Sequence, residues 1–217
     1  MSLGAMLGLP FLACVLLSLI LGYLGLHVLK REVIFIDIAV AQIAALGALA
    51  GHLFLGVPGD SVRALSCGIG ATLVAALFFA VARRRAAQLP IEAIIGITYA
   101  ISAGGALFMI GQGTGGHAHV QDMLGGALLW VKGPELLGTG AAFAVVGACF
   151  GLFRKPFQRI SDGYAEAVAA GLSVIGWDFL FYALCGLVIT LAVRLAGVVV
   201  VFCFLIVPAT VSAMFSA

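Results

Sequence analysis

Charged side chains are scarce in this chain. Only 9% of its 217 residues are Asp, Glu, Lys or Arg, against about a quarter in a typical soluble domain. Eleven basic and nine acidic residues are too few to cover the surface of a water-soluble protein of this length. A net charge of +2 also excludes a large nucleic-acid-binding surface. Because 64% of the residues are apolar, the chain is not disordered, and the lipid bilayer is the remaining solvent.

Sequence motifs for nucleotide binding and hydrolysis are also missing. The chain has no Walker A motif, no HExxH and no GxSxG, so any ATP must be bound by another subunit. Its five cysteines are scattered and form no CxxC pair, which favours buried free thiols over metal ligands. No Lys or Arg precedes the first apolar run, so that run is predicted to be a retained span rather than a signal peptide.

Long apolar runs are what the sequence does contain. A membrane-spanning helix needs about 20 mostly apolar residues, and seven runs approach this length. They cover residues 10–29, 33–55, 62–82, 91–110, 137–153, 177–193 and 197–215. The runs are too long and too uniformly apolar for the strands of a membrane barrel. The predicted fold is therefore an all-α polytopic membrane protein.

Basic residues are distributed unevenly between the two sides of these spans. Eight of the eleven follow the first, third and fifth runs, which places them on one side: Lys30, Arg31, Arg83, Arg84, Arg85, Arg154, Lys155 and Arg159. Loops rich in Lys and Arg face the cytoplasm. This pattern predicts that the N-terminus lies outside.

Two connecting segments carry further features. Residues 111–135 lie on the outer side and contain His117 and His119, either a weak cation site or solvated loop residues. Within them, residues 123–131 are apolar but too short to span, which predicts a re-entrant or interfacial helix. Residues 155–175 lie on the cytoplasmic side. There, Ser161 and Asp162 are predicted to cap a short helix that Gly171 ends.

Polar residues inside the spans are candidates for function. Asp37 and His27 each lie about 6 Å from the membrane surface at the ends of two runs joined by a short link. A carboxylate and an imidazole together suit zinc or manganese. The alternative is an ion pair in which Arg31 or His27 neutralises Asp37. Gln42 lies about 140° around the helix from Asp37, where it lines a cavity or bonds to a neighbouring helix.

Glu92 and Asp178 both lie near the start of a predicted span. A carboxylate in the first turn is favoured by the helix itself, and this position explains both residues without a function.

Five stretches, taken together, resemble the permease of metal-type ABC importers. They are LKREVIFIDIAVAQIAALG (29–47), EAIIGITYA (92–100), LGGALLWV (124–131), SDGYAEAVAAG (161–171) and GVVVVFCFLIVPA (197–209). They occur in the family's order over nearly the whole chain. Members of this family take up zinc, manganese or iron from an extracytoplasmic binding protein.

The resemblance implies a single permease domain over residues 1–217 in the cytoplasmic membrane. It further implies a homodimer that works with a separate ATPase, binds no cofactor of its own and is not itself an enzyme. In such permeases the helix that here contains Asp162, Tyr164, Glu166 and Gly171 docks on the ATPase. The binding protein would dock near residues 111–135, and Asp37, with His27, Gln42, His117 and His119 as further candidates, would contact the metal.

Two departures from the family pattern stand out. Many members have a His four residues after the Asp of the second helix, where this chain has Ala41. Relatives also continue beyond the helix that contains Pro208, whereas this sequence stops at Ala217, which predicts a fragment, a shortened member or a truncated product. Two other classes compete with the importer: a secondary transporter or channel that uses Asp37 and Glu92 as a relay, and a structural subunit without cargo.

Overall fold

Seven long helices dominate the structure, a computed structural model that describes residues 3–58, 61–86, 88–112 and 128–215. The long helices are α1 (Leu3–Lys30), α2 (Ile36–Leu55), α3 (Val62–Arg85), α4 (Ile91–Gln112), α6 (Gly133–Leu152), α9 (Val174–Ala196) and α10 (Val198–Phe215). Each is long and apolar enough to cross a membrane. The described residues contain no strand. The predicted all-α polytopic fold with seven spans is therefore confirmed.

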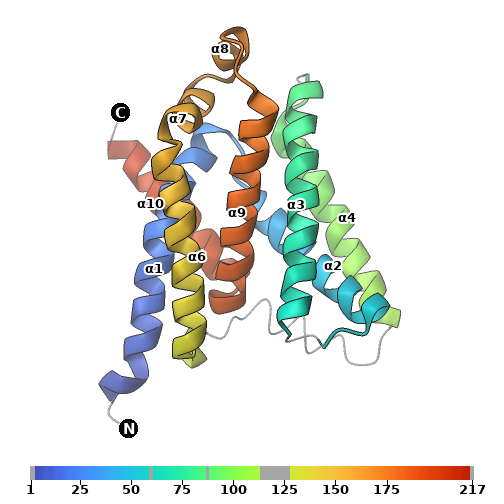
Figure 1. Cartoon of the computed structure of the whole chain (residues 1–217), viewed down its shortest axis with the longest axis vertical. Coiled ribbons are helices and arrows are strands. Elements are labelled where there is room, and N and C mark those ends of the chain that lie inside the picture. Colours follow the sequence, from blue (N-terminus) through green and yellow to red (C-terminus); the bar gives the residue numbers. More distant parts are fainter. Residues whose placement is uncertain (1–2, 59–60, 87, 113–127, 216–217) are drawn as a thin grey trace.

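Helix α9 occupies the centre of the bundle. Helices α2, α3 and α4 pack on one another on one side of it, and α1, α6 and α10 lie on the other side (Figure 1). In the most apolar 18-residue stretch of α9, 61% of the residues are buried, against 22 to 39% in the same stretch of the other spans. A helix that is apolar all round and surrounded by others is expected at the core of a bundle.

Helices α1 and α10 approach each other closely at Gly25. A Cβ at this position would overlap the carbonyl oxygen of Leu205 and lie 2.9 Å from the Cβ of Ala209. Small residues allow helix backbones to come together in lipid, where no hydrophobic force drives association. Gly25 therefore fixes the spacing of this helix pair.

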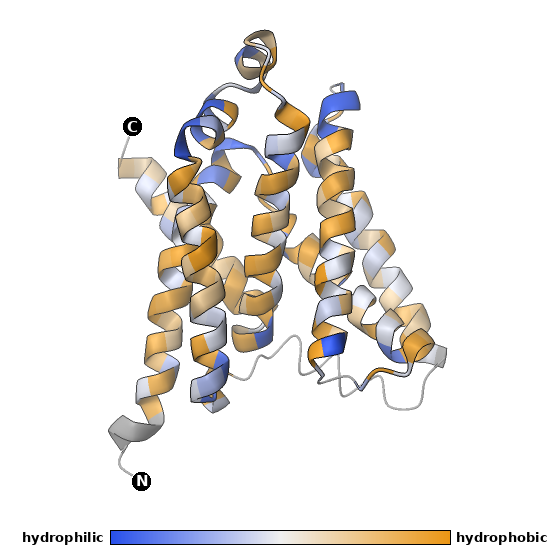
Figure 2. Ribbon diagram, in the orientation of Figure 1, coloured by the Kyte–Doolittle hydropathy of each residue, from blue (hydrophilic) through white to orange (hydrophobic). Residues whose placement is uncertain are grey.

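Polar residues gather at one end of the bundle, which we call the basic end. It holds the last turns of α1 and α3 and the two short helices α7 (Arg154–Asp162) and α8 (Tyr164–Ala169). Hydrophilic residues concentrate there, whereas the middle of the bundle is mostly hydrophobic, with paler turns among the orange ones (Figure 2). All eight basic residues of the asymmetric loops belong to this end, as the predicted topology requires.

The single short helix predicted between the fifth and sixth spans is two helices. The chain is extended at Gly163, where φ is −160° and ψ is 93°, and this break separates α7 from α8. Ser161 and Asp162 end α7 and do not cap α8, so that part of the prediction was wrong. Gly171 has a φ of 74°, a conformation that favours glycine, and it follows α8 as predicted.

The outer connection falls largely outside the described residues. His117, His119 and most of the predicted re-entrant segment 123–131 lie there. Its described end is a single 3-10 turn, η1 (Leu128–Trp130), in which Trp130 is 75% exposed.

Candidate functional site

Asp37 is a buried carboxylate that pairs with no side chain in the part of the chain that the structure describes. It lies in the first turn of α2 and is only 1% exposed. Its carboxylate lies at the start of α2 near the backbone N–H groups of Asp37 and Ile38, and no described side chain hydrogen-bonds to either oxygen. A buried charge without a partner is costly, and such a group in a span is a candidate for function. Asp37 is thus available to a proton or a cation.

Glu92 contacts the chain just before Asp37. It occupies the first turn of α4, and its Oε1 accepts a hydrogen bond of 2.9 Å from the backbone N–H of Phe35. Its Oε2 is buried and has no described partner. Asp37 and Glu92 together present three buried carboxylate oxygens that pair with no described side chain, and such oxygens are ligands for a metal cation. The position of Glu92 in the first turn of α4 was predicted, and from the sequence only the competing relay hypothesis linked Glu92 to Asp37.

Arg31 does not neutralise Asp37, so this alternative from the sequence is wrong. Arg31 is 2% exposed, and its Nη1 donates to Oδ1 of Asp178 at 2.6 Å. The guanidinium also lies 3.9 Å from the centre of the Phe181 ring. Burial lowers the pKa of Arg31 below its usual value, and the negative charge of Asp178 opposes this shift.

Asp178 connects three parts of the chain. It is fully buried, and Nη1 of Arg83 lies 3.4 Å from the same Oδ1 that Arg31 contacts. The first turn of α9 contains no acidic residue, so the predicted role of Asp178 in that turn was wrong. Asp178 instead joins α9 to the end of α3 and to the link between α1 and α2.

His27 has partners other than Asp37. Its Nδ1 lies 3.1 Å from Oγ of Ser161, and its ring packs against Tyr23, Phe150 and Phe181. It makes neither a hydrogen bond nor an ion pair with Asp37. The structure therefore does not bring together the two residues that the sequence suggested as a metal site.

No complete metal site is formed within the part of the chain that the structure describes. There, no three His, Cys, Asp or Glu side chains come together. Gln42 is half-buried on α2, and His117 and His119 lie outside the described residues. Asp37 and Glu92 thus supply at most two ligand side chains, and a complete metal site needs further ligands.

Helices α7 and α8 are tied to the spans by polar contacts. Ser161 accepts a 2.9 Å hydrogen bond from Nε of Arg31, and Asp162 pairs with Nζ of Lys30 at 2.5 Å. These contacts explain why neither side chain caps α8. The guanidinium of Arg83 lies 4.4 Å from the centre of the Tyr164 ring. Burial raises the pKa of Tyr164 above its usual value.

An aromatic contact holds the junction of α6, α7 and α9. The Trp177 ring lies 5.4 Å from Phe153 and 5.8 Å from Phe157, measured between ring centres. Ile160, Ala167 and Val174 form a small apolar cluster beneath α8. Glu166 and Gly171 are exposed. A displacement of α7 or α8 would therefore act on α1, α3 and α9 through side chains already in contact.

Comparisons with known proteins agree with this architecture. A structure described as PsaBC from Streptococcus pneumoniae in complex with Fab contains a chain with the same fold, with a TM-score of 0.71. The two chains are 20% identical over 96% of this chain and 73% of the other. A search of curated proteins finds no match.

The family itself is established from the sequence. The model of the ABC 3 transport family matches residues 5–217, which is nearly the whole chain. Together with the shared fold, this match confirms the resemblance to permeases of metal-type ABC importers. The chain is a multi-pass membrane protein that belongs to the ABC 3 transport family.

Proposed function

We propose that this chain is the permease subunit of an ATP-driven importer that carries a divalent metal ion, zinc or manganese, across the cytoplasmic membrane. The observation that carries the proposal is the pair of short helices α7 and α8 at the basic end, in a chain matched by the ABC 3 family over residues 5–217. A chain without a nucleotide-binding motif needs such an exposed element to receive motion from an ATPase.

Asp37 and Glu92 supply the ion contact in this proposal. Three of their four carboxylate oxygens are buried and pair with no described side chain, and carboxylates bind divalent cations such as zinc and manganese. Two acidic groups are too few for a complete coordination sphere. A homodimer with the two sites facing each other would supply four carboxylates, whereas Gln42, about 140° around α2 from Asp37, would contact the ion elsewhere on its path.

The other candidate ligands have more distant roles. His27 is held by Ser161 and aromatic rings, so it supports α7 rather than the ion. His117 and His119 lie in the outer segment 111–135, where an extracytoplasmic metal-binding protein would dock and deliver its ion.

The ATPase contact is assigned to α8 and its flanks. Asp162, Tyr164, Glu166 and Gly171 lie on this segment, on the side that the basic loops place in the cytoplasm. ATP binding by the partner would move α8. The contacts of Arg31 with Ser161 and Asp178 would pass that movement to the link before α2, next to Asp37, and so switch the access of the ion site.

The proposal is tested by copurification from native membranes, followed by uptake of radioactive zinc or manganese into liposomes. We expect an ATPase subunit to accompany the chain and uptake to require ATP. Glu166→Lys should reduce ATPase recovery, whereas the control Glu135→Lys, exposed at the opposite end of the bundle, should not. Uptake that needs no ATPase and follows the proton gradient would contradict the proposal and support a secondary transporter.

A further inference from the structure

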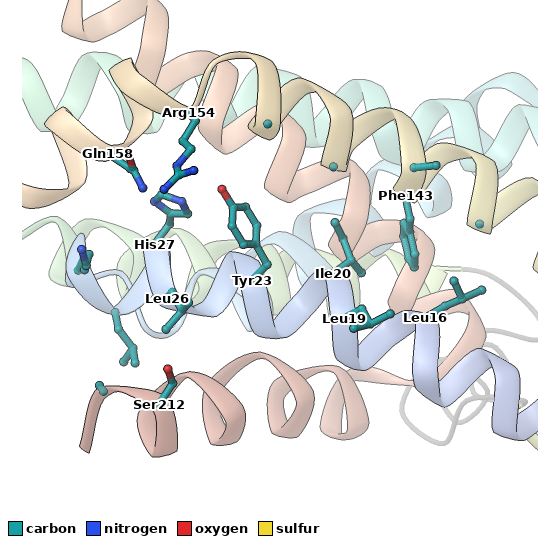
Figure 3. Close-up of a pocket in the computed structure, with 17 residues that line it drawn as sticks. Leu16, Leu19, Ile20, Tyr23, Leu26, His27, Phe143, Arg154, Gln158 and Ser212 are labelled. Atoms are coloured by element: carbon teal, nitrogen blue, oxygen red, sulfur yellow. The ribbon is translucent and has the colours of Figure 1, made fainter. Parts of the chain in front are cut away.

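A groove between α1, α6 and α10 is separate from the acidic pair and from α8. It has a volume of about 840 Å³. Its walls come from one face of α1, one face of α6, the start of α7 and the end of α10 (Figure 3). Neither Asp37 nor Glu92 lines it, so it plays no part in the ion site proposed above.

The groove extends over one leaflet of a membrane. Along α1 it runs from Leu16 to Lys30, a 14-residue step of about 21 Å at 1.5 Å per residue. Half of a bilayer with its headgroups is about 20 to 22 Å thick. A spanning helix would instead have to cross the whole hydrocarbon core of about 30 Å. The length of the groove therefore fits a lipid better than a further helix.

Small residues keep the α6 side of the groove open. Gly140, Ala144, Gly147 and Gly151 line it at spacings of four, three and four residues, which places them on one helix face. A Cβ at Gly147 would lie 4.0 Å from Cδ1 of Ile20, and one at Gly151 would meet no atom within 4 Å. The result is a smooth apolar trough opposite Leu16, Leu19 and Ile20 of α1.

The basic end of the groove is polar and positively charged. Arg154, Gln158, His27 and Tyr23 gather there, while the labelled residues at the other end are Leu16, Leu19, Ile20 and Phe143 (Figure 3). No acidic residue lines the groove. Lys30 is paired with Asp162, but Arg154 is exposed and makes no ion pair with any described residue.

We propose that this groove binds an anionic phospholipid of the cytoplasmic leaflet. The headgroup phosphate lies against Arg154 and Gln158, and one acyl chain follows the trough of α6 towards Leu16. Basic pockets between helices on the cytoplasmic side are suited to anionic headgroups, and the apolar walls exclude a free phosphate as the occupant. The lipid would bridge α1, α6 and α7 at the point where α7 leaves the membrane.

The test uses the full chain in nanodiscs of equal phosphatidylglycerol and phosphatidylcholine, with bound lipids counted by native mass spectrometry. We expect wild type to retain phosphatidylglycerol in preference to phosphatidylcholine. Arg154→Gln should weaken that preference about fivefold, the factor equivalent to about 1 kcal/mol for one basic side chain at a lipid surface. Gly147→Leu should reduce retention of both lipids because it fills the trough.

Two control variants change the same residue types outside the groove. Arg85→Gln removes an exposed charge at the end of α3, and Gly138→Leu adds a side chain on α6 where a Cβ meets nothing within 4 Å. Both should retain lipid as wild type does. Equal retention of the two lipids by wild type, or equal losses in the controls, would overturn the proposal. Arg154 is exposed, so the charge test does not depend on a core substitution.

A photoreactive phosphatidylglycerol locates the occupant directly. With the reactive group on the acyl chain, we expect crosslinks on α1 between residues 16 and 23 and on α6 between residues 143 and 147. Crosslinks confined to other helices would overturn the assignment. A protein crosslinker offers a second check. If it joins residues of the groove to a second copy of the chain or to another protein segment, the assignment is also overturned.

Discussion

At the scale of single residues, Arg31 and Asp178 form a pair in which both side chains are fully buried. Such a pair is expensive to desolvate, but removing one partner is worse because it leaves the other charge buried and uncompensated. Arg83, whose Nη1 lies 3.4 Å from Asp178, can replace only part of the lost contact. Removing one residue of the pair should therefore destabilise the protein more than replacing both.

Arg31→Met should lower the free energy of unfolding by about 3 to 5 kcal/mol, as expected when a buried ion pair loses one partner. The double variant Arg31→Met with Asp178→Asn should be more stable than Arg31→Met alone, because the fully buried charge of Asp178 is removed and the charge left without its carboxylate, Arg83, is partly exposed. Unfolding in detergent micelles measures both. As a control, Lys30→Met breaks a pair that is more than half exposed and should cost less than about 1 kcal/mol. A double variant less stable than the single one would contradict this account.

Asp37 presents the opposite situation, because its carboxylate pairs with no side chain among the described residues. Asp37→Asn keeps the shape and removes the charge. The variant should be at least as stable as wild type, since a buried charge without a partner is unfavourable, and it should lower metal uptake by about tenfold or more.

Thermal unfolding and metal content of cells check the two halves of this prediction. Glu32→Gln is the matched control, because Glu32 is an exposed acidic residue in the link just before α2. A variant with normal uptake would remove Asp37 from the ion path and support a subunit without cargo. A marked loss of stability would show instead that Asp37 has a structural partner.

Local sequence patterns predicted the polar residues but not their partners. Asp37, Glu92 and Asp178 stood out because charges in apolar runs are rare. Arg31 and Asp178, however, are 147 positions apart, and no local pattern predicts which distant charge will meet which. The predicted contact between Asp37 and His27 was wrong for the same reason. His27 contacts Ser161 instead, a residue of α7 that lies 134 positions away in the chain.

At the scale of helices, the contact between α1 and α10 depends on the absence of a side chain at Gly25. Gly25→Ala should destabilise the protein by about 1 to 3 kcal/mol, the usual cost of overpacking, because its Cβ would overlap the Leu205 carbonyl. Gly22→Ala is the matched control on the same helix. Its Cβ would lie 3.5 Å from Pro208, which is an ordinary contact.

Melting curves in detergent should separate the two alanine variants. Equal stability of both would show that α1 and α10 have room to move apart.

The spans were predictable because two properties decide them, length and hydropathy, and both are read directly from the sequence. The division of the segment after α6 into two helices, α7 and α8, could not be predicted from length and hydropathy. Gly163 was a visible breaking signal, but Ser161 and Asp162 looked like caps for the next helix. Their side chains instead bind Arg31 and Lys30, so tertiary contacts decided where α7 ends.

At the scale of the whole molecule, the two ends of the bundle should face opposite sides of the membrane. In a background without the five native cysteines, Glu166→Cys should react with a membrane-impermeant maleimide only from the cytoplasmic side. Glu135→Cys should react only from outside. Both side chains are exposed in the structure, so accessibility does not limit either reaction. Labelling of residue 166 from outside would invert the topology and exclude an ATPase contact there.

The aromatic contact beneath α7 allows movement of this helix to be followed by tryptophan fluorescence. The chain has only two tryptophans: Trp130 is largely exposed in η1, and Trp177 lies against Phe153 and Phe157 at the base of α7. After Trp130→Phe, the tryptophan emission of this chain comes from one indole, beside the element that an ATPase would move, and the partner subunits measured alone supply the background. A shift in its emission when nucleotide is added to the assembled complex would time that movement without any attached dye.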